Sequence, residues 1–135
     1  MRKSLGFTII ELLISMTIIG LLASLAVASY RSARENSRNA KRRGDMVALQ
    51  QAFEQYYIAN NQNYAATCNT MTTGYLQGSY PAETYVGWAG YNSTCTTSSY
   101  CVCAKLEPAG NTKGNASNTS CNFVSGEYFC VQNQQ

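Results

Sequence analysis

The sequence contains no histidine, only two prolines and few charged residues among its 135 positions. Without histidine it lacks imidazole general bases, Ser-His and Cys-His nucleophile pairs and histidine-ligated metal sites, which are the commonest routes to enzyme chemistry. Only 13% of residues are charged, yet the mean hydropathy is slightly negative. Apolar residues must therefore be concentrated in one part of the chain. We expect no enzyme activity, no cofactor and no metal site.

Three segments of contrasting composition follow one another along the chain. The segment 1–6 is short and basic, and the segment 7–30 is apolar with a single charged residue, Glu11. Residues 64–135 are polar and hold all six cysteines, but only two lysines and three glutamates. The total length is that of one domain, so we expect one small polar domain after the apolar segment.

The six cysteines are even in number and lie in a small polar region with little aliphatic content. This pattern is typical of a disulfide framework in an oxidising compartment. Two alternatives are reduced thiols in a cytosolic protein and a four-cysteine zinc site, although Cys101 and Cys103 are spaced more tightly than zinc ligands usually are. The sequence leaves the pairing open. The predicted disulfide cysteines are Cys68, Cys95, Cys101, Cys103, Cys121 and Cys130.

The apolar segment at residues 7–30 is long enough to cross a membrane. As a helix it would extend about 36 Å, against a hydrocarbon core of roughly 30 Å. The apolar part of a secretory signal is shorter, at about 7–15 residues, and ends in a cleavage site between small residues. We therefore interpret this segment as retained in the mature protein.

Residues 31–60 continue the helix, because they contain no proline and only one glycine. Apolar residues recur there at spacings of three and four, which places them on one helical face. That face consists of Met46, Leu49, Phe53 and Tyr56 with Tyr57 beside them, and the opposite face carries Lys41, Gly44, Gln51 and Gln55. A run of Asn and Gln at 60–63 predicts the end of the helix. The apolar face must be covered, most simply by the polar domain that follows.

The polar domain shows patterns of strands and loops. Residues 100–106 alternate with a period of two, and residues 128–131 and 85–91 are further candidate strands. The long loop between the first two, rich in Asn and Gly at 111–118, needs a tether, which cysteines near its end could supply. The predicted fold class is α+β, with a long N-terminal helix packed on a small antiparallel sheet that carries disulfide-tethered loops.

The most informative pattern is KSLGFTIIELL at residues 3–13. A cut after Gly6 would create a new α-amino group on Phe7, one helical turn before Glu11. Inserting a carboxylate at the centre of a membrane segment costs about 2.5–3.5 kcal/mol, and less near its end, so we expect the carboxylate to have a partner. The expected partner is the Phe7 amine of a neighbouring copy. The alternative is that Glu11 reaches the polar interface and only favours the helix N-terminus electrostatically.

This segment resembles the class III leader of type IV pilins and type II secretion pseudopilins, with its basic leader, its Gly–Phe junction and Glu at the fifth position after the cut. The similarity extends through residues 7–30, including Gly20 and Tyr30, and less specifically through residues 31–64. Beyond that point only the placement of cysteines near the C-terminus is similar. A pilin-like fold is therefore expected.

The resemblance implies a processing and assembly pathway. A prepilin peptidase would cut between Gly6 and Phe7 and methylate the new Phe7 amine. Glu11 would neutralise that amine on an adjacent subunit while the helices bundle into a filament core. One departure is Ala28, where many members of the family have proline; without proline we expect no kink in the helix there.

The basic residues after the apolar segment create a conflict over topology. Counting only lysine and arginine would place this end of the helix in the cytoplasm, whereas six cysteines favour an extracytoplasmic domain. We follow the cysteines and the leader. The basic cluster could then bind anionic lipid headgroups, pair with acidic residues of neighbouring subunits, attract DNA or form a solvated charged face. It consists of Arg31, Arg34, Arg38, Lys41, Arg42 and Arg43.

Two weaker patterns lie in the polar domain. Asn92, Asn115 and Asn118 begin N-glycosylation sequences, which are expected by chance in so Asn-, Ser- and Thr-rich a region. No Asp-rich calcium loop occurs in the C-terminal half of the sequence, which counts against a major pseudopilin whose domain needs calcium.

The sequence thus predicts a structural subunit of a type IV pilus-like filament, serving adhesion, motility or DNA uptake. Its parts are a leader at 1–6, a transmembrane and filament-core helix at 7–30, an amphipathic half-helix at 31–62 and an extracytoplasmic domain at 63–135. The expected precursor is a single-pass protein of the bacterial inner membrane that later joins a cell-surface or periplasm-spanning filament. Its expected partners are further copies or other pilins, prepilin peptidase, an inner-membrane assembly platform, the lipid bilayer and, more weakly, DNA.

Two other functions fit the same patterns. Within the family, the chain could be a pseudopilin of a type II secretion or competence machine. Outside the family, it could be a monomeric, membrane-anchored binding domain that needs no filament.

Overall fold

The computed structural model describes residues 6–135 and begins with one long helix, α1, at Ile9–Ala59. The chain forms two compact units, the first reaching Glu35 and the second running from Asn36 to the C-terminus. The first five residues of the predicted leader lie outside the described residues. The helix continues through position 28, where the sequence has alanine, and the absence of a kink there stays a prediction.

The helix ends where the run of Asn and Gln begins, as the sequence predicts. The backbone N–H of Gln62 donates to the carbonyl of Tyr57 at 3.0 Å, and the side-chain amide of Asn60 donates to the carbonyl of Tyr56 at 2.8 Å. Asn61 and Gln62 have φ angles of 53° and 60°, in the left-handed region that turns the chain out of a helix. These bonds satisfy carbonyl groups that the last turn leaves without helical partners.

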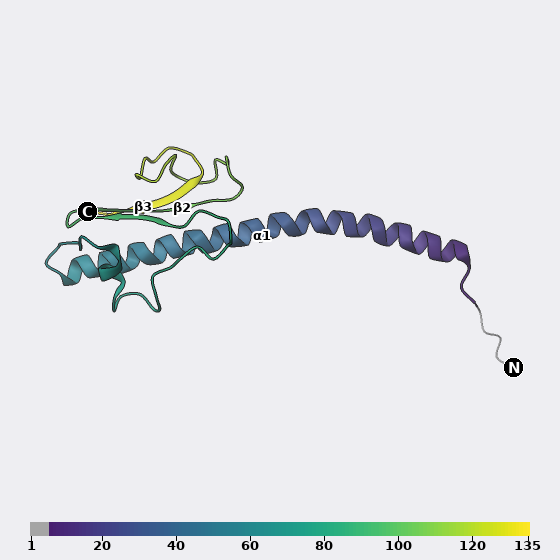
Figure 1. Ribbon diagram of the computed structural model, residues 1–135, viewed down its shortest axis with the longest axis horizontal. Coiled ribbons are helices and arrows are strands. Elements are labelled where there is room, and N and C mark those ends of the chain that lie inside the picture. Colours follow the sequence, from purple (N-terminus) through teal and green to yellow (C-terminus); the bar gives the residue numbers. More distant parts are fainter. Residues whose placement is uncertain (1–5) are drawn as a thin grey trace. The chain divides into compact units, whose positions relative to one another are not determined.

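A three-stranded antiparallel sheet lies alongside the C-terminal part of α1 (Figure 1). Its strands are β1 at Asn92–Cys95, β2 at Tyr100–Lys105 and β3 at Tyr128–Gln132, in the order β1-β2-β3. A short 3-10 helix, η1, spans Cys68–Thr72. The predicted α+β fold class is confirmed, and so are the strands predicted at 100–106 and 128–131.

The strand predicted at 85–91 is wrong. Gly87 has a φ angle of 84°, which belongs to a turn, and this segment forms turns and bends instead of a strand. The third strand is β1, which follows directly and pairs with β2 through a short hairpin. Its sequence, Asn-Ser-Thr-Cys, has no apolar alternation because it is an edge strand that is mostly exposed.

The core lies between α1 and the sheet. Met46, Leu49 and Phe53 are completely buried on one face of the helix, as their spacing predicts. The sheet meets them with Tyr100 and Val102, and the Phe53 and Tyr100 rings make an edge-to-face contact with centroids 4.9 Å apart. Burial of each large apolar side chain contributes about 1.5–3 kcal/mol, so this interface stabilises the second unit substantially.

The opposite face of the sheet is covered by the loop between β2 and β3. Ala116 on this loop is buried against Cys103 and Cys130. The Asn115 side chain completes the edge of β3, because it donates to the carbonyl of Cys130 at 2.9 Å and accepts from the N–H of Cys130 at 2.7 Å. A small second core therefore exists under the loop, held by disulfides.

Candidate functional site

The N-terminal end of α1 is closed by a reciprocal capping box between Thr8 and Glu11. Glu11 Oε2 accepts hydrogen bonds from the Thr8 N–H at 2.9 Å and from the Thr8 hydroxyl at 2.7 Å. The Glu11 N–H donates to the Thr8 hydroxyl oxygen at 3.3 Å. Two N–H groups that the helix itself leaves unpaired are thereby satisfied. The sequence signal, Thr followed three residues later by Glu, was present and would have predicted this contact.

The predicted cleavage junction lies directly before this cap. Phe7 has 84% of its surface exposed, and Gly6 is exposed and has open space around its Cα. In the intact chain the Phe7 nitrogen is a peptide nitrogen, so the amine that Glu11 is predicted to meet arises only after cleavage. The pairing of Glu11 with a neighbour's amine stays a prediction.

The rest of the first unit presents an almost unbroken aliphatic surface. Within the described residues, α1 is long and apolar enough to cross a membrane, judged by length and composition. The hydroxyl groups in this stretch bond back to the helix: Ser15 donates to the Glu11 carbonyl, Thr17 to that of Ile14, and Ser24 to that of Leu21, all at 2.7–2.8 Å. Such local bonds let hydroxyl groups enter an apolar environment at little cost.

Two members of the basic cluster, Arg38 and Arg42, are engaged in ion pairs inside the protein. For these two residues the expected alternative of a solvated charged helix face is wrong. The Arg42 side chain is 1% exposed and lies between two carboxylates. Its Nε donates to Glu83 at 2.5 Å, and its Nη2 lies 2.6 Å from Glu107. Arg38 forms a two-point contact with Glu107, at 2.8 Å and 2.5 Å. Neither side chain is free to bind lipid or DNA through these groups.

Aromatic rings and an amide complete this ion-pair cluster of Arg38, Arg42, Glu83 and Glu107. The Arg42 guanidinium lies 5.3 Å from the centroid of the Trp88 ring, and that of Arg38 lies 4.4 Å from the Tyr85 ring. Asn39 donates to the Glu107 carbonyl at 2.7 Å and accepts from its N–H at 2.9 Å.

Electrostatics in the cluster favour the ionised forms. The hydrogen bond from Arg38 holds the pKa of Glu107 below its ordinary value, against the opposite effect of burial. Burial raises the pKa of Glu83, but hydrogen bonds from Arg42 and from backbone N–H groups outweigh it, so the net shift is downward. Burial lowers the pKa of Arg42, and the two carboxylates more than reverse that effect. The cluster ties the helix to the segment 83–88 and to the segment that follows β2.

The other members of the basic cluster have separate surroundings. Arg31 and Arg34 are exposed at the end of the first unit, and Arg34 lies 5.6 Å from the Tyr30 ring centroid. Lys41 makes a surface ion pair with Asp45 at 3.0 Å. Arg43 donates to the carbonyl of Lys113 at 2.7 Å. The predicted contacts with lipid, DNA or neighbouring subunits therefore remain a proposal for the exposed members, Arg31, Arg34, Lys41 and Arg43.

All six cysteines are paired in three disulfides. The bonds join Cys68 with Cys95, Cys101 with Cys121, and Cys103 with Cys130. The first connects η1 to β1, and the other two hold the long loop and β3 against β2. The sequence could not fix this pairing, because it depends on which strands lie side by side. In this form the sulfur atoms are not available as zinc ligands.

Comparisons with known proteins give sequence matches that include the start of the helix. Residues 1–27 match the family described as "Prokaryotic N-terminal methylation motif". The chain is 32% identical over 90 residues to type II secretion system core protein G of Escherichia coli, with 62% of each protein covered. It is 30% identical over 91 residues to the protein of that name from Dickeya chrysanthemi, covering 63% of this chain and 60% of the relative. No solved structure matches it.

A third relative, type II secretion system core protein G of Aeromonas hydrophila, is 36% identical over 61 residues, which is 45% of this chain and 43% of the relative. The chain thus spans between about two fifths and three fifths of the length of these curated relatives. The fold and the helix start define a protein with a prepilin-type N-terminal segment followed by a small disulfide-bonded α+β domain. The motif match and these partial similarities support the resemblance to type IV pilins and pseudopilins.

Proposed function

We propose that the chain is a structural subunit that is inserted in the inner membrane, cut between Gly6 and Phe7, and polymerised through its N-terminal helix. The observation that carries this proposal is the capped carboxylate of Glu11 at the start of an exposed aliphatic helix. Such a surface is unstable in water and needs either lipid or neighbouring helices around it. A bilayer would cover it in the precursor, and copies of the same helix would cover it in a filament.

The surroundings of the Glu11 carboxylate differ between the bilayer around the precursor and the packed helices of a filament. In the structure its hydrogen bonds come from the neutral N–H and hydroxyl groups of Thr8, which leave its negative charge in place. A neighbouring Phe7 amine would supply a compensating positive charge once the leader is removed. Because opposite charges attract more strongly where water is excluded, this pairing would favour the packed helices over separate ones.

We further propose that the filament is of the pseudopilin type, in a secretion machine. The sequence alone favoured a surface pilus, but the relatives named above are type II secretion core proteins, and they support the alternative better. The partners expected from this assignment are other pilin-like subunits and prepilin peptidase, with an inner-membrane platform for assembly. The role is structural, and no catalytic step is assigned to the chain.

Mass spectrometry of the protein from membranes tests the processing step. We expect a chain that begins at N-methylated Phe7. An intact Met1 or an unmethylated Phe7 would count against pilin-type processing.

Deletion of the protein in its own host separates the two kinds of filament. If the chain is a pseudopilin, the deletion should reduce the amount of secreted protein in the culture medium and should not reduce the filaments sheared from the cell surface. Loss of sheared filaments with normal secretion would favour a surface pilus. If the chain is a monomeric binding domain, the deletion should cause neither defect. Electron microscopy of the overproduced protein should in that case show no fibres.

A further inference from the structure

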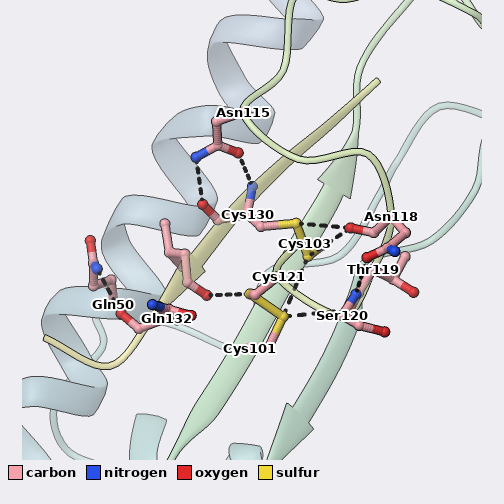
Figure 2. Close-up of a disulfide and its surroundings, with 11 residues drawn as sticks. Gln50, Cys101, Cys103, Asn115, Asn118, Thr119, Ser120, Cys121, Cys130 and Gln132 are labelled. Carbon is pink, nitrogen blue, oxygen red and sulfur yellow. Dashed lines mark hydrogen bonds between the residues drawn. A yellow bond between two sulfur atoms is a disulfide. The ribbon is translucent and has the colours of Figure 1, made fainter. Parts of the chain in front are cut away.

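Two of the three disulfides lie side by side on the face of the sheet that is turned away from α1 (Figure 2). Cys101 and Cys103 are two residues apart on β2, so their side chains point to the same face. Their Sγ atoms are 3.7 Å apart, and the Sγ of Cys121 lies within 4.8 Å of both. A thiolate formed at Cys101 would therefore lie next to a sulfur atom of the neighbouring disulfide.

The two disulfides differ in their access to solvent. Cys103 and Cys130 are buried, with 0% and 1% of their surface exposed, whereas Cys101 and Cys121 are partly exposed. Thiol–disulfide exchange requires the attacking thiolate to reach a sulfur atom. External thiols can therefore reach the Cys101–Cys121 bond first, while the folded domain shields the Cys103–Cys130 bond.

We propose that Cys101–Cys121 is an exchange site through which external thiols act on the buried Cys103–Cys130 bond. An external thiolate attacks the Sγ of Cys121, forms a mixed disulfide there and releases Cys101 as a thiolate. The Cys101 thiolate attacks the Sγ of Cys103, which forms a Cys101–Cys103 bond. Cys130 leaves as a thiolate and takes a proton from water. Two disulfides are broken and two are formed, so the exchange involves no net oxidation or reduction.

The exchanged state is short-lived because of strand geometry. Residues two apart on a strand have Cα atoms roughly 6.6 Å apart, which is near the upper limit of about 6.8 Å for a disulfide. The Cys130 thiolate therefore tends to attack back and restore the original pairing. The consequence is a route by which thiols can open and re-form the buried bond without unfolding the sheet.

Pulsed alkylation of the full chain in detergent tests this relay. The protein is incubated with 2-mercaptoethanol, and aliquots are quenched with acid, which stops thiol exchange. Free thiols are then alkylated with N-ethylmaleimide in acidic urea, where buried cysteines are accessible, and the modified cysteines are mapped by mass spectrometry without reduction. We expect Cys130 to be alkylated in molecules that carry 2-mercaptoethanol on Cys121 and an internal Cys101–Cys103 link. Alkylation of Cys101 with the Cys103–Cys130 bond intact throughout would overturn the proposal.

Two sets of variants sharpen the result. The Cys101→Ser/Cys121→Ser double variant should slow the opening of Cys103–Cys130 by about tenfold or more, because the attacking thiolate is removed. The control Cys68→Ser/Cys95→Ser should leave the rate unchanged, and an equal or faster rate in the first variant would contradict the relay. If the double variant fails to fold, Cys121→Ser alone decides, since its Cys101 thiol should give alkylated Cys130 without added thiol. Alkylation confined to Cys101 in that variant would refute the proposal.

Discussion

The Nη2 atom of Arg42 lies 2.6 Å from Oε1 of Glu107, and the two side chains are only 1% and 7% exposed. The contact joins the middle of α1 to the segment that follows β2. Because Arg42 also contacts Glu83, one buried guanidinium holds three separate parts of the second unit together. Removing one member of such a cluster leaves a buried charge without its partner.

Replacing Arg42 with methionine should therefore destabilise the second unit strongly. A buried ion pair that loses one partner typically costs about 3–5 kcal/mol. Thermal unfolding of the full chain in detergent, followed by circular dichroism, measures this effect. The matched control is Lys41→Ala on the same helix, which removes an exposed ion pair with Asp45 and should cost only about 0.2–0.5 kcal/mol. Similar losses in the two variants would show that the buried cluster contributes nothing special.

The same cluster predicts loss of stability in acid. The folded pKa values of Glu83 and Glu107 lie below the ordinary value of 4.5, so the folded state binds fewer protons than the unfolded state in this range. Their contribution is present above pH 4.5 and is lost as the pH falls through the lowered pKa values. Between pH 7 and pH 3, the melting temperature should decrease once the pH is lower than about 4.5. A Glu107→Gln variant should show a weaker pH dependence, and an unchanged one would contradict the assignment.

The disulfide-tethered loop depends on a glycine at position 114. A Cβ atom built there would lie 2.0 Å from the carbonyl oxygen of Tyr128, which is backbone and cannot turn aside. Gly114→Ala should therefore displace the loop and cost about 1–3 kcal/mol, as overpacking does. Gly90→Ala is the control, because a Cβ at that position meets nothing within 4 Å. Equal unfolding temperatures for the two variants would show that the loop adjusts freely.

The features that the sequence predicts correctly are those that depend on one periodic pattern within a single element. The spacing of Met46, Leu49 and Phe53 predicted the buried face of α1, and the alternation at 100–106 predicted β2. Both signals are local, because each depends only on which side of a single element meets the core. The long helix and its end at the Asn-rich run followed from the same kind of local evidence.

The features that were missed depend on contacts between distant segments. Glu83 and Glu107 meet Arg42 from 41 and 65 positions away, and no local pattern marks them as its partners. The edge strand β1 carries no apolar alternation and is defined by its pairing with β2. The Thr8–Glu11 cap is the exception, since its signature is local and could have been read from the sequence.

We propose that the charge of Glu11 drives assembly after the leader is removed, and the Glu11→Gln variant removes that charge alone. Glutamine keeps the size and a side-chain oxygen that can accept from Thr8, but removes the negative charge. We predict normal cleavage at Gly6–Phe7 by mass spectrometry. Under overproduction that gives filaments from the unmodified chain, we predict no filaments from this variant by electron microscopy. Glu35→Gln, which removes the other acidic charge of the first unit, should assemble normally. Normal filaments from the Glu11→Gln variant would contradict the account.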